Sequence, residues 1–108
     1  MSKYHAIRTE VDGIVFDSKK EATRWSELTL LQKHGEIRNL ERQVKYTITI
    51  NNVLICRYYA DFRYEDCKLG NEVVVEDVKG IKNGSAYSMF RIKKKLMRAV
   101  YGIEILET

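Results

Sequence analysis

The chain of 108 residues contains no proline, only two cysteines and no long apolar run. Cys56 and Cys67 lie outside any CxxC or Cys/His ligand spacing, so we expect reduced thiols rather than a disulfide framework or a zinc site. A membrane helix needs about 18 consecutive apolar residues, and a signal peptide needs a basic start followed by an apolar stretch. The sequence shows neither, which predicts a cytoplasmic protein with no membrane partner.

The composition indicates a single folded domain with a basic surface. The mass is 12.7 kDa. A chain of this size builds one hydrophobic core, so we take residues 1–108 as one domain. Charged residues make up 31% and hydrophobic residues 44% of the chain, which is typical of folded proteins rather than of disordered tails. The net charge of +4 favours an anionic partner.

Apolar periodicity and turn residues predict a helix, three strands, a second helix and a last strand. Before them, Asp12-Gly13 indicates the turn of a small hairpin within residues 4–16. The S-x-x-E pattern at Ser18 predicts a helix that ends at His34-Gly35, and Ser85 is expected to cap the second helix. The predicted strands span residues 41–50, 54–64, 72–79 and 103–106, and the second helix spans residues 86–101. This order predicts an α/β fold with a mixed sheet, because the last strand follows a helical crossover.

Four charged residues interrupt these patterns where burial is expected. Asp61 lies in the middle of the second strand, Asp77 and Lys79 share one face of the third, and Glu21 falls on the helix face that meets the sheet. A buried charge is costly unless it has a partner or a ligand. Because Mg²⁺ prefers hard oxygen ligands, Asp61, Asp77 and the carbonyl oxygen of Val78 are candidate metal ligands, with Glu21 holding a water or a second ion. Lys79 would orient the attacking water or stabilise negative charge on a phosphate.

At these residues the sequence resembles the PD-(D/E)XK nuclease superfamily. Asp61, the string Asp77-Val78-Lys79 after an apolar strand, and Glu21 in a leading helix match its catalytic pattern, whereas Ala60 stands where that pattern often has proline. Segments 3–6, 12–14, 16–22 and 75–80 are also similar to a family of small phage-encoded proteins of this superfamily, some of them endonucleases or Holliday-junction resolvases.

The resemblance implies a restriction-endonuclease-like αβββαβ core with a mixed β-sheet flanked by helices. It further implies a metal-dependent endodeoxyribonuclease that hydrolyses DNA phosphodiester bonds, including those of branched DNA such as Holliday junctions, with Mg²⁺ as cofactor and Mn²⁺ as a substitute. By the same resemblance the catalytic residues are Glu21, Gln43, Asp61, Asp77 and Lys79, with Gln43 corresponding to a glutamine placed before the first strand. A phage origin would place the protein in the cytoplasm of the bacterial host, and paired cuts would require a homodimer.

The second predicted helix carries a basic face. From residue 80 to residue 103 the sequence has no acidic residue, whereas charge runs on solvated helices usually alternate in sign. Lys93 projects onto the apolar stripe of this helix, either to reach past it into solvent or to approach the site. The remaining basic residues are candidates for contact with the DNA backbone: Lys82, Arg91, Lys94, Lys95 and Arg98.

Each candidate also has a purely structural explanation. Glu21 could close a capping box with Ser18, Asp61 could pair with an arginine on its own strand face, and Asp77 with Lys79 could form an ordinary salt bridge. The alternative functions are a non-catalytic phage DNA-binding protein that retains the nuclease fold, and a protein-interaction module. The large aromatic residues are expected to pack in the core or on a sheet face rather than to stack on nucleic-acid bases: Trp25, Tyr58, Tyr59, Phe62 and Phe90.

Overall fold

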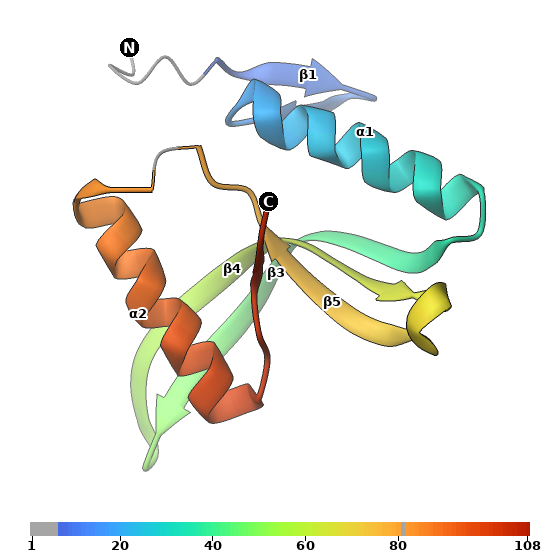
Figure 1. Ribbon diagram of the computed structural model, residues 1–108. Helices are drawn as coiled ribbons and strands as arrows, with labels where there is room; N and C mark the ends of the chain where they lie inside the picture. Colours follow the sequence, from blue (N-terminus) through green and yellow to red (C-terminus); the bar gives the residue numbers. More distant parts are fainter. Residues whose placement is uncertain (1–6, 81) are drawn as a thin grey trace.

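The computed structural model describes residues 7–80 and 82–108 and has an α/β architecture (Figure 1). A short hairpin precedes a helix, three strands, a second helix and a last strand, as predicted. The elements are β1 (Thr9–Val11), β2 (Ile14–Phe16), α1 (Lys19–Lys33), β3 (Ile37–Ile50), β4 (Val53–Asp66), the 3₁₀ helix η1 (Cys67–Leu69), β5 (Glu72–Asp77), α2 (Gly84–Tyr101) and β6 (Leu106–Glu107).

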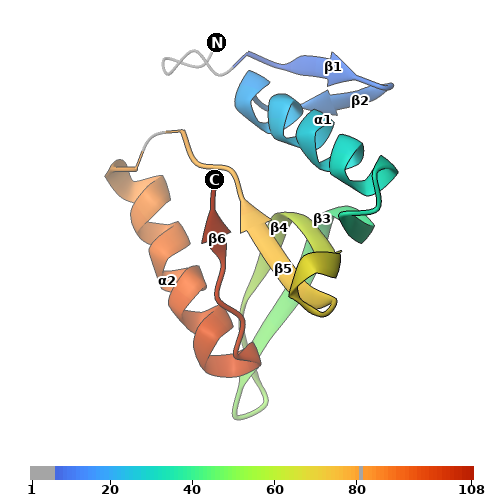
Figure 2. The same ribbon diagram turned by 45° about the vertical axis from the view of Figure 1, so that its right-hand side comes forward.

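The main sheet is mixed and has the strand order β3-β4-β5-β6. β3, β4 and β5 are antiparallel neighbours, and β6 runs parallel to β5 after the crossover through α2. α1 and the hairpin β1–β2 lie over one end of the sheet, whereas α2 lies along the long β3–β4 hairpin (Figure 2). β4 pairs with β5 only over residues 62–66, so the β3–β4 hairpin extends well beyond the pairing with β5. The predicted mixed sheet flanked by helices is confirmed.

Two hydrophobic clusters form the core, one beneath each helix. Phe16, Leu28 and Phe62 are fully buried in the cluster under α1, and Ile48 and Met97 are fully buried in the cluster under α2. β4 contributes to both clusters, because its first half packs under α2 and its second half under α1. A polar side chain at this crossover is therefore flanked by apolar packing on both sides.

Turn and cap residues explain where several elements begin and end. The Ser18 hydroxyl accepts a hydrogen bond of 3.1 Å from the Glu21 amide, which is the cap predicted for α1. Asn51 and Asn52 have φ angles of 51° and 65° and form the two-residue turn between β3 and β4, where left-handed conformations match the twist of the strands. Gly102, with φ of 68°, ends α2.

Several predicted boundaries are wrong. β5 ends at Asp77 rather than at residue 79, so Lys79 lies just beyond the strand. β3 begins at Ile37 rather than at residue 41, because a bulge at residues 39–40 interrupts the strand pairing and hides the strand's alternation. Ser85 does not cap α2; the helix begins at Gly84, after Asn83, whose side chain makes no capping hydrogen bond. The last strand begins at residue 106 rather than at residue 103, since pairing with β5 starts only there.

Candidate active site

Three carboxyl groups from three different elements meet in the sheet. Phe62 of β4 pairs with Arg42 of β3 and with Glu76 of β5. Continuing this register by one residue brings Asp61 beside Gln43 and Asp77. The carboxyl groups of Asp61 and Asp77 lie within hydrogen-bonding reach of each other, and Glu21 reaches Asp61 from α1. Gln43 donates a hydrogen bond of 3.3 Å from Nε2 to Asp61 Oδ1. The structure therefore brings together the three acids and the glutamine that the sequence singled out.

The positions of Glu21 and Gln43 differ from those that the sequence predicted. The backbone amide of Glu21 joins the helix cap, but its carboxyl group lies against Asp61 instead of completing a capping box with Ser18. Gln43 lies within β3 rather than before the first strand. Its φ of 51° is a left-handed conformation that non-glycine residues seldom adopt, and such backbone is concentrated at functional sites.

Burial and the charges of neighbouring acids raise the pKa of two members of this acid cluster, which comprises Glu21, Asp61 and Asp77. Burial raises the pKa of Asp61 to about 8, and the neighbouring charges of Asp77 and Glu21 add to the rise, whereas a hydrogen bond of 2.8 Å from the Val78 amide opposes it. Burial also raises the pKa of Glu21. Glu21 is 8% exposed and Asp77 only 4%. Negative charge on Asp61 and Glu21 is therefore disfavoured unless a proton or a cation compensates it.

Asp77 is held by two partners on the α2 side of the sheet. Its Oδ1 lies 2.7 Å from the ammonium group of Lys79, and its Oδ2 accepts a hydrogen bond from the Tyr58 hydroxyl. Burial, followed by the charge of Asp77, raises the pKa of Tyr58, so this hydroxyl stays protonated and remains a donor. The Lys79 ammonium also sits 3.8 Å from the ring centre of Phe90 on α2. The orientation of Lys79 is therefore fixed by contacts with both a carboxylate and an aromatic ring.

A pocket of about 310 Å³ opens between the end of β5 and the first half of α2. Lys93 lines it, so this side chain reaches toward the site. Tyr59 also lines the pocket and is 51% exposed, so of the two places expected for it, core or sheet face, it occupies the sheet face. Among the described residues, the pocket is lined by Tyr58, Tyr59, Asp61, Asp77, Lys79, Ala86, Met89, Phe90 and Lys93.

A fourth buried acid, Glu76, was not recognised in the sequence. Its carboxylate is fully buried and accepts hydrogen bonds from Arg24 Nε (2.8 Å) and Nη2 (2.7 Å), together with the Tyr64 hydroxyl. Arg24 follows Glu21 by about one turn of α1, and Glu76 precedes Asp77 in β5. The pair thus fixes α1 on the sheet in the register that brings Glu21 to the acid cluster. The signal available in the sequence was Glu76 itself, a charged residue directly after the apolar run Val73–Val75.

The predicted DNA-binding residues gather on another side of α2. Four of them line a pocket of about 480 Å³: Arg91, Lys94, Lys95 and Arg98. Glu107 of β6 lies 2.7 Å from Lys94 and 3.9 Å from Lys82, and Glu104 lies 3.7 Å from Arg98. The expectation of a basic face without acidic partners is therefore wrong in part. Glu104 and Glu107, which follow α2 in the sequence, lie beside the helix and pair with its basic residues.

Arg91 and Lys95 form no ion pair within residues 7–80 and 82–108. At about 100° per residue, the side of α2 that carries them is offset from the side that carries Met89 and Lys93 toward the acid cluster. A nucleic acid on the basic side would therefore have to pass around the helix to reach the acids.

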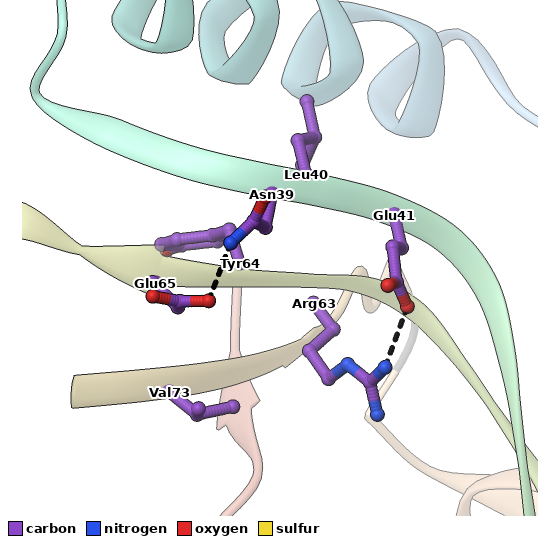
Figure 3. Close-up of a pocket in the computed structure, with 7 residues that line it drawn as sticks. All are labelled: Asn39, Leu40, Glu41, Arg63, Tyr64, Glu65 and Val73. Atoms are coloured by element: carbon purple, nitrogen blue, oxygen red, sulfur yellow. Dashed lines mark hydrogen bonds and ion pairs between the residues drawn. The ribbon is translucent and has the colours of Figure 1, made fainter. Parts of the chain in front are cut away.

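A further pocket, of about 490 Å³, lies at the open end of the β3–β4 hairpin, where β3 begins and β4 ends (Figure 3). Its acidic groups have partners: Arg63 Nη2 lies 2.7 Å from Glu41, and Glu65 lies 2.9 Å from Arg38 and accepts a hydrogen bond of 2.6 Å from Asn39. Figure 3 shows the Glu41–Arg63 and Asn39–Glu65 pairs next to each other, each linking β3 to β4. This pocket offers no free charged group to a ligand, in contrast to the pocket at Asp61.

The acid cluster has hard oxygen donors but few of them. Within the described ranges, no group of three or more His, Cys, Asp and Glu side chains has the arrangement of a metal site. Two carboxylates and a main-chain oxygen are sufficient for Mg²⁺, which keeps several waters. The carbonyl oxygen of Val78 accepts no hydrogen bond from the described residues, whereas those of Asp77 and Lys79 are bonded to Thr108 and Lys20.

The comparisons with known proteins identify a family. The model of the family described as "Protein of unknown function (DUF1064)" matches residues 1–105. The chain belongs to this family. No curated protein and no solved structure matches the chain significantly. Neither of the two described helices has the length and apolar character to cross a membrane. The DUF1064 match covers every candidate catalytic residue, and its description names no activity, so the function has to be argued from the acid cluster itself.

Proposed function

We propose that this protein is a metal-dependent endodeoxyribonuclease that uses the acid cluster and Lys79. The observation that carries the proposal is the meeting of Glu21, Asp61 and Asp77, three acids far apart in sequence, in one half-buried place beside an ammonium group. Strongly perturbed carboxyl groups at a pocket are typical of functional sites. The resemblance of these same positions to the PD-(D/E)XK superfamily supports this assignment and suggests DNA as the substrate.

The donor set fits a hard divalent cation such as Mg²⁺ or Mn²⁺. Asp61, Asp77 and the carbonyl oxygen of Val78 would hold the ion, and Glu21 would hold a water or a second ion. All of these donors are oxygens, and a cation among them would replace the proton that the cluster otherwise needs. When bound, the ion would supply positive charge opposite the scissile phosphodiester and acidify a nearby water.

The chain's own residues would hold the substrate and its charge in place. Lys79 lies in the pocket wall and would offset the negative charge that develops on the phosphate. Gln43 would keep Asp61 oriented through its hydrogen bond. Arg91 and Lys95 would contact the DNA backbone, because they lack an acidic partner among the described residues. Cuts in both strands of a duplex or junction would require a two-fold dimer, since one cluster serves one strand.

One observation favours the alternative of a non-catalytic DNA-binding protein with this fold. Both oxygens of Asp77 already have partners, Lys79 and Tyr58, so the side chain is satisfied without a metal. In that case the cluster would be structural and only the basic side of α2 would act. The two functions differ in whether Asp77 is required for strand cleavage.

A cleavage assay separates them. We expect the protein to cut DNA in Mg²⁺ or Mn²⁺, and not in EDTA, when linear, single-stranded, flapped and four-way substrates are compared. Asp77→Asn should lose cutting and retain DNA binding, as should Asp61→Ala. Glu72→Gln is the matched control, because it neutralises an exposed acid at the other end of the same strand. Cutting that survives in Asp77→Asn and Asp61→Ala would refute the nuclease proposal, and binding without any cutting by the native chain would support the alternative.

A further inference from the structure

The outer face of the β3–β4 hairpin is exposed and carries no acidic residue between residues 43 and 60. Tyr46, Ile48 and Tyr58 of the hairpin are buried under α2, whereas the alternate side chains are exposed throughout. We call this exposed surface the ribbon face; it consists of Lys45, Thr47, Thr49, Ile55, Arg57 and Tyr59.

The ribbon face leads directly to the acid cluster. Lys45 pairs across the strands with Tyr59, and Thr47 pairs with Arg57, so basic and hydroxyl or aromatic side chains lie next to each other. Tyr59 precedes Asp61 by two residues on the same strand, which is a separation of about 7 Å. Both side chains line the same pocket. A chain molecule that lies along the ribbon face would therefore enter the candidate active site beside Tyr59.

The chemistry of the ribbon face differs from that of the basic side of α2. Neither Lys45 nor Arg57 forms an ion pair with any residue in the described part of the chain, whereas Lys94 and Arg98 of α2 have acidic partners. Tyr59 is 51% exposed and is the aromatic residue of this face. Free cations interleaved with an exposed aromatic ring are the features with which proteins bind unpaired nucleic-acid strands.

We infer that the ribbon face binds a single-stranded segment of nucleic acid and feeds it to the acid cluster. Tyr59 stacks on one base, and Lys45 and Arg57 contact the phosphates that follow. A duplex would expose only base edges and phosphates to this face, so the ring of Tyr59 would have no partner there; the faces of bases are available only in an unpaired strand. The inference rests on the proposed nuclease function and deepens it, since it names the substrate class: DNA with an unpaired segment next to the scissile bond.

The test measures binding without cleavage, in EDTA, by the fluorescence anisotropy of a short labelled oligonucleotide in single-stranded and duplex form. Tyr59→Ala should weaken single-strand affinity by about tenfold, because stacking on one base is lost. Tyr59→Phe should retain it. Lys45→Glu with Arg57→Glu should lower the slope of log affinity against log salt by about 1.4 for the single strand. Lys33→Glu, an exposed charge reversal at the end of α1, is the matched control and should leave the affinity unchanged.

Equal single-strand affinities of the native protein, Tyr59→Ala and the double charge reversal would overturn the inference, and so would a preference for duplex that these changes do not reduce. Failure of the nuclease function shows itself differently, as metal-dependent cutting that persists in Asp77→Asn or that the native chain never performs. The anisotropy result decides the ribbon face in either event, because no metal is present.

Discussion

Replacing Asp61 with asparagine should stabilise the metal-free protein at alkaline pH while removing its activity. Burial and the neighbouring acids raise the pKa of Asp61 from 3.8 to about 8. Between pH 3.8 and pH 8, Asp61 therefore keeps its proton in the folded state but has lost it in the unfolded state. The free energy of unfolding falls as the pH rises through this range. Asparagine carries no charge at any of these pH values, and its side-chain oxygen can still accept the hydrogen bond from the Val78 amide. The loss of stability with rising pH should then largely disappear.

The size of the effect follows from the difference in proton affinity. At about 1.4 kcal/mol for each tenfold change, a pKa of about 8 in place of 3.8 sets an upper limit of about 6 kcal/mol. Because Glu21 can share the proton with Asp61, we expect about 2 kcal/mol at pH 8 and close to none at pH 4. For a chain of this size, a gain of about 2 kcal/mol raises the midpoint of thermal unfolding by roughly 8 °C or more.

The assay is thermal and urea unfolding of the native chain and Asp61→Asn in EDTA, from pH 4 to pH 8, with Glu72→Gln as control. Mg²⁺ should then raise the midpoint of the native chain at pH 8, because a ligand of the folded state stabilises it, and should not raise that of Asp61→Asn. A variant that is no more stable than the native chain at pH 8, or a difference that does not grow with pH, would refute the view that burial, together with the neighbouring acids, disfavours the charged form of Asp61.

Lys79→Met should lower the rate of Mg²⁺-dependent cutting by at least about a hundredfold, as loss of a charge-stabilising group does. A gel-based assay measures the cutting, and anisotropy should show that the affinity for duplex DNA is preserved; cutting at the native rate would contradict the prediction. Arg24→Leu should lower the free energy of unfolding in urea by about 3 kcal/mol, because Glu76 would remain buried without its partner, and a loss below about 1 kcal/mol would show that the pair is not needed. Arg91→Glu with Lys95→Glu should reduce the salt slope of duplex binding by about 2, and an unchanged slope would exclude these two residues from the interface.

The order of elements could be predicted because local signals agree with the fold. Ser18 caps α1 and the Asn51-Asn52 turn joins β3 to β4, as the sequence indicated. The boundaries that failed depend on contacts that are remote in sequence. At the bulge of residues 39–40, the Leu40 amide donates a hydrogen bond to the side chain of Gln32 in α1. The residue pattern of β3 alone cannot predict this hydrogen bond.

The candidate site was predicted in part for a similar reason. Asp61 and Asp77 were recognisable because a charge in an apolar strand stands out, and the strand register then placed them side by side. Glu76 carries the same signal, but its role depends on Arg24, which lies 52 residues earlier in the chain. The ion pair between Lys94 and Glu107 could not be predicted either, because it depends on β6 lying parallel to β5 after α2.

The contrast between Glu76 and Asp61 is the strongest physical argument for a ligand at the acid cluster. Both carboxyl groups are buried in the same sheet, but Glu76 receives a bidentate arginine and a tyrosine hydroxyl, so the fold can neutralise a buried acid fully. Asp61 receives hydrogen bonds from an amide and from Gln43, forms no ion pair with the described residues, and faces two further acids. A cluster kept only for stability would gain from the arrangement that Glu76 has, since an uncompensated buried charge is costly. A cation from solution would supply the positive charge that the fold does not give Asp61, whereas without one a bound proton has to compensate this side chain.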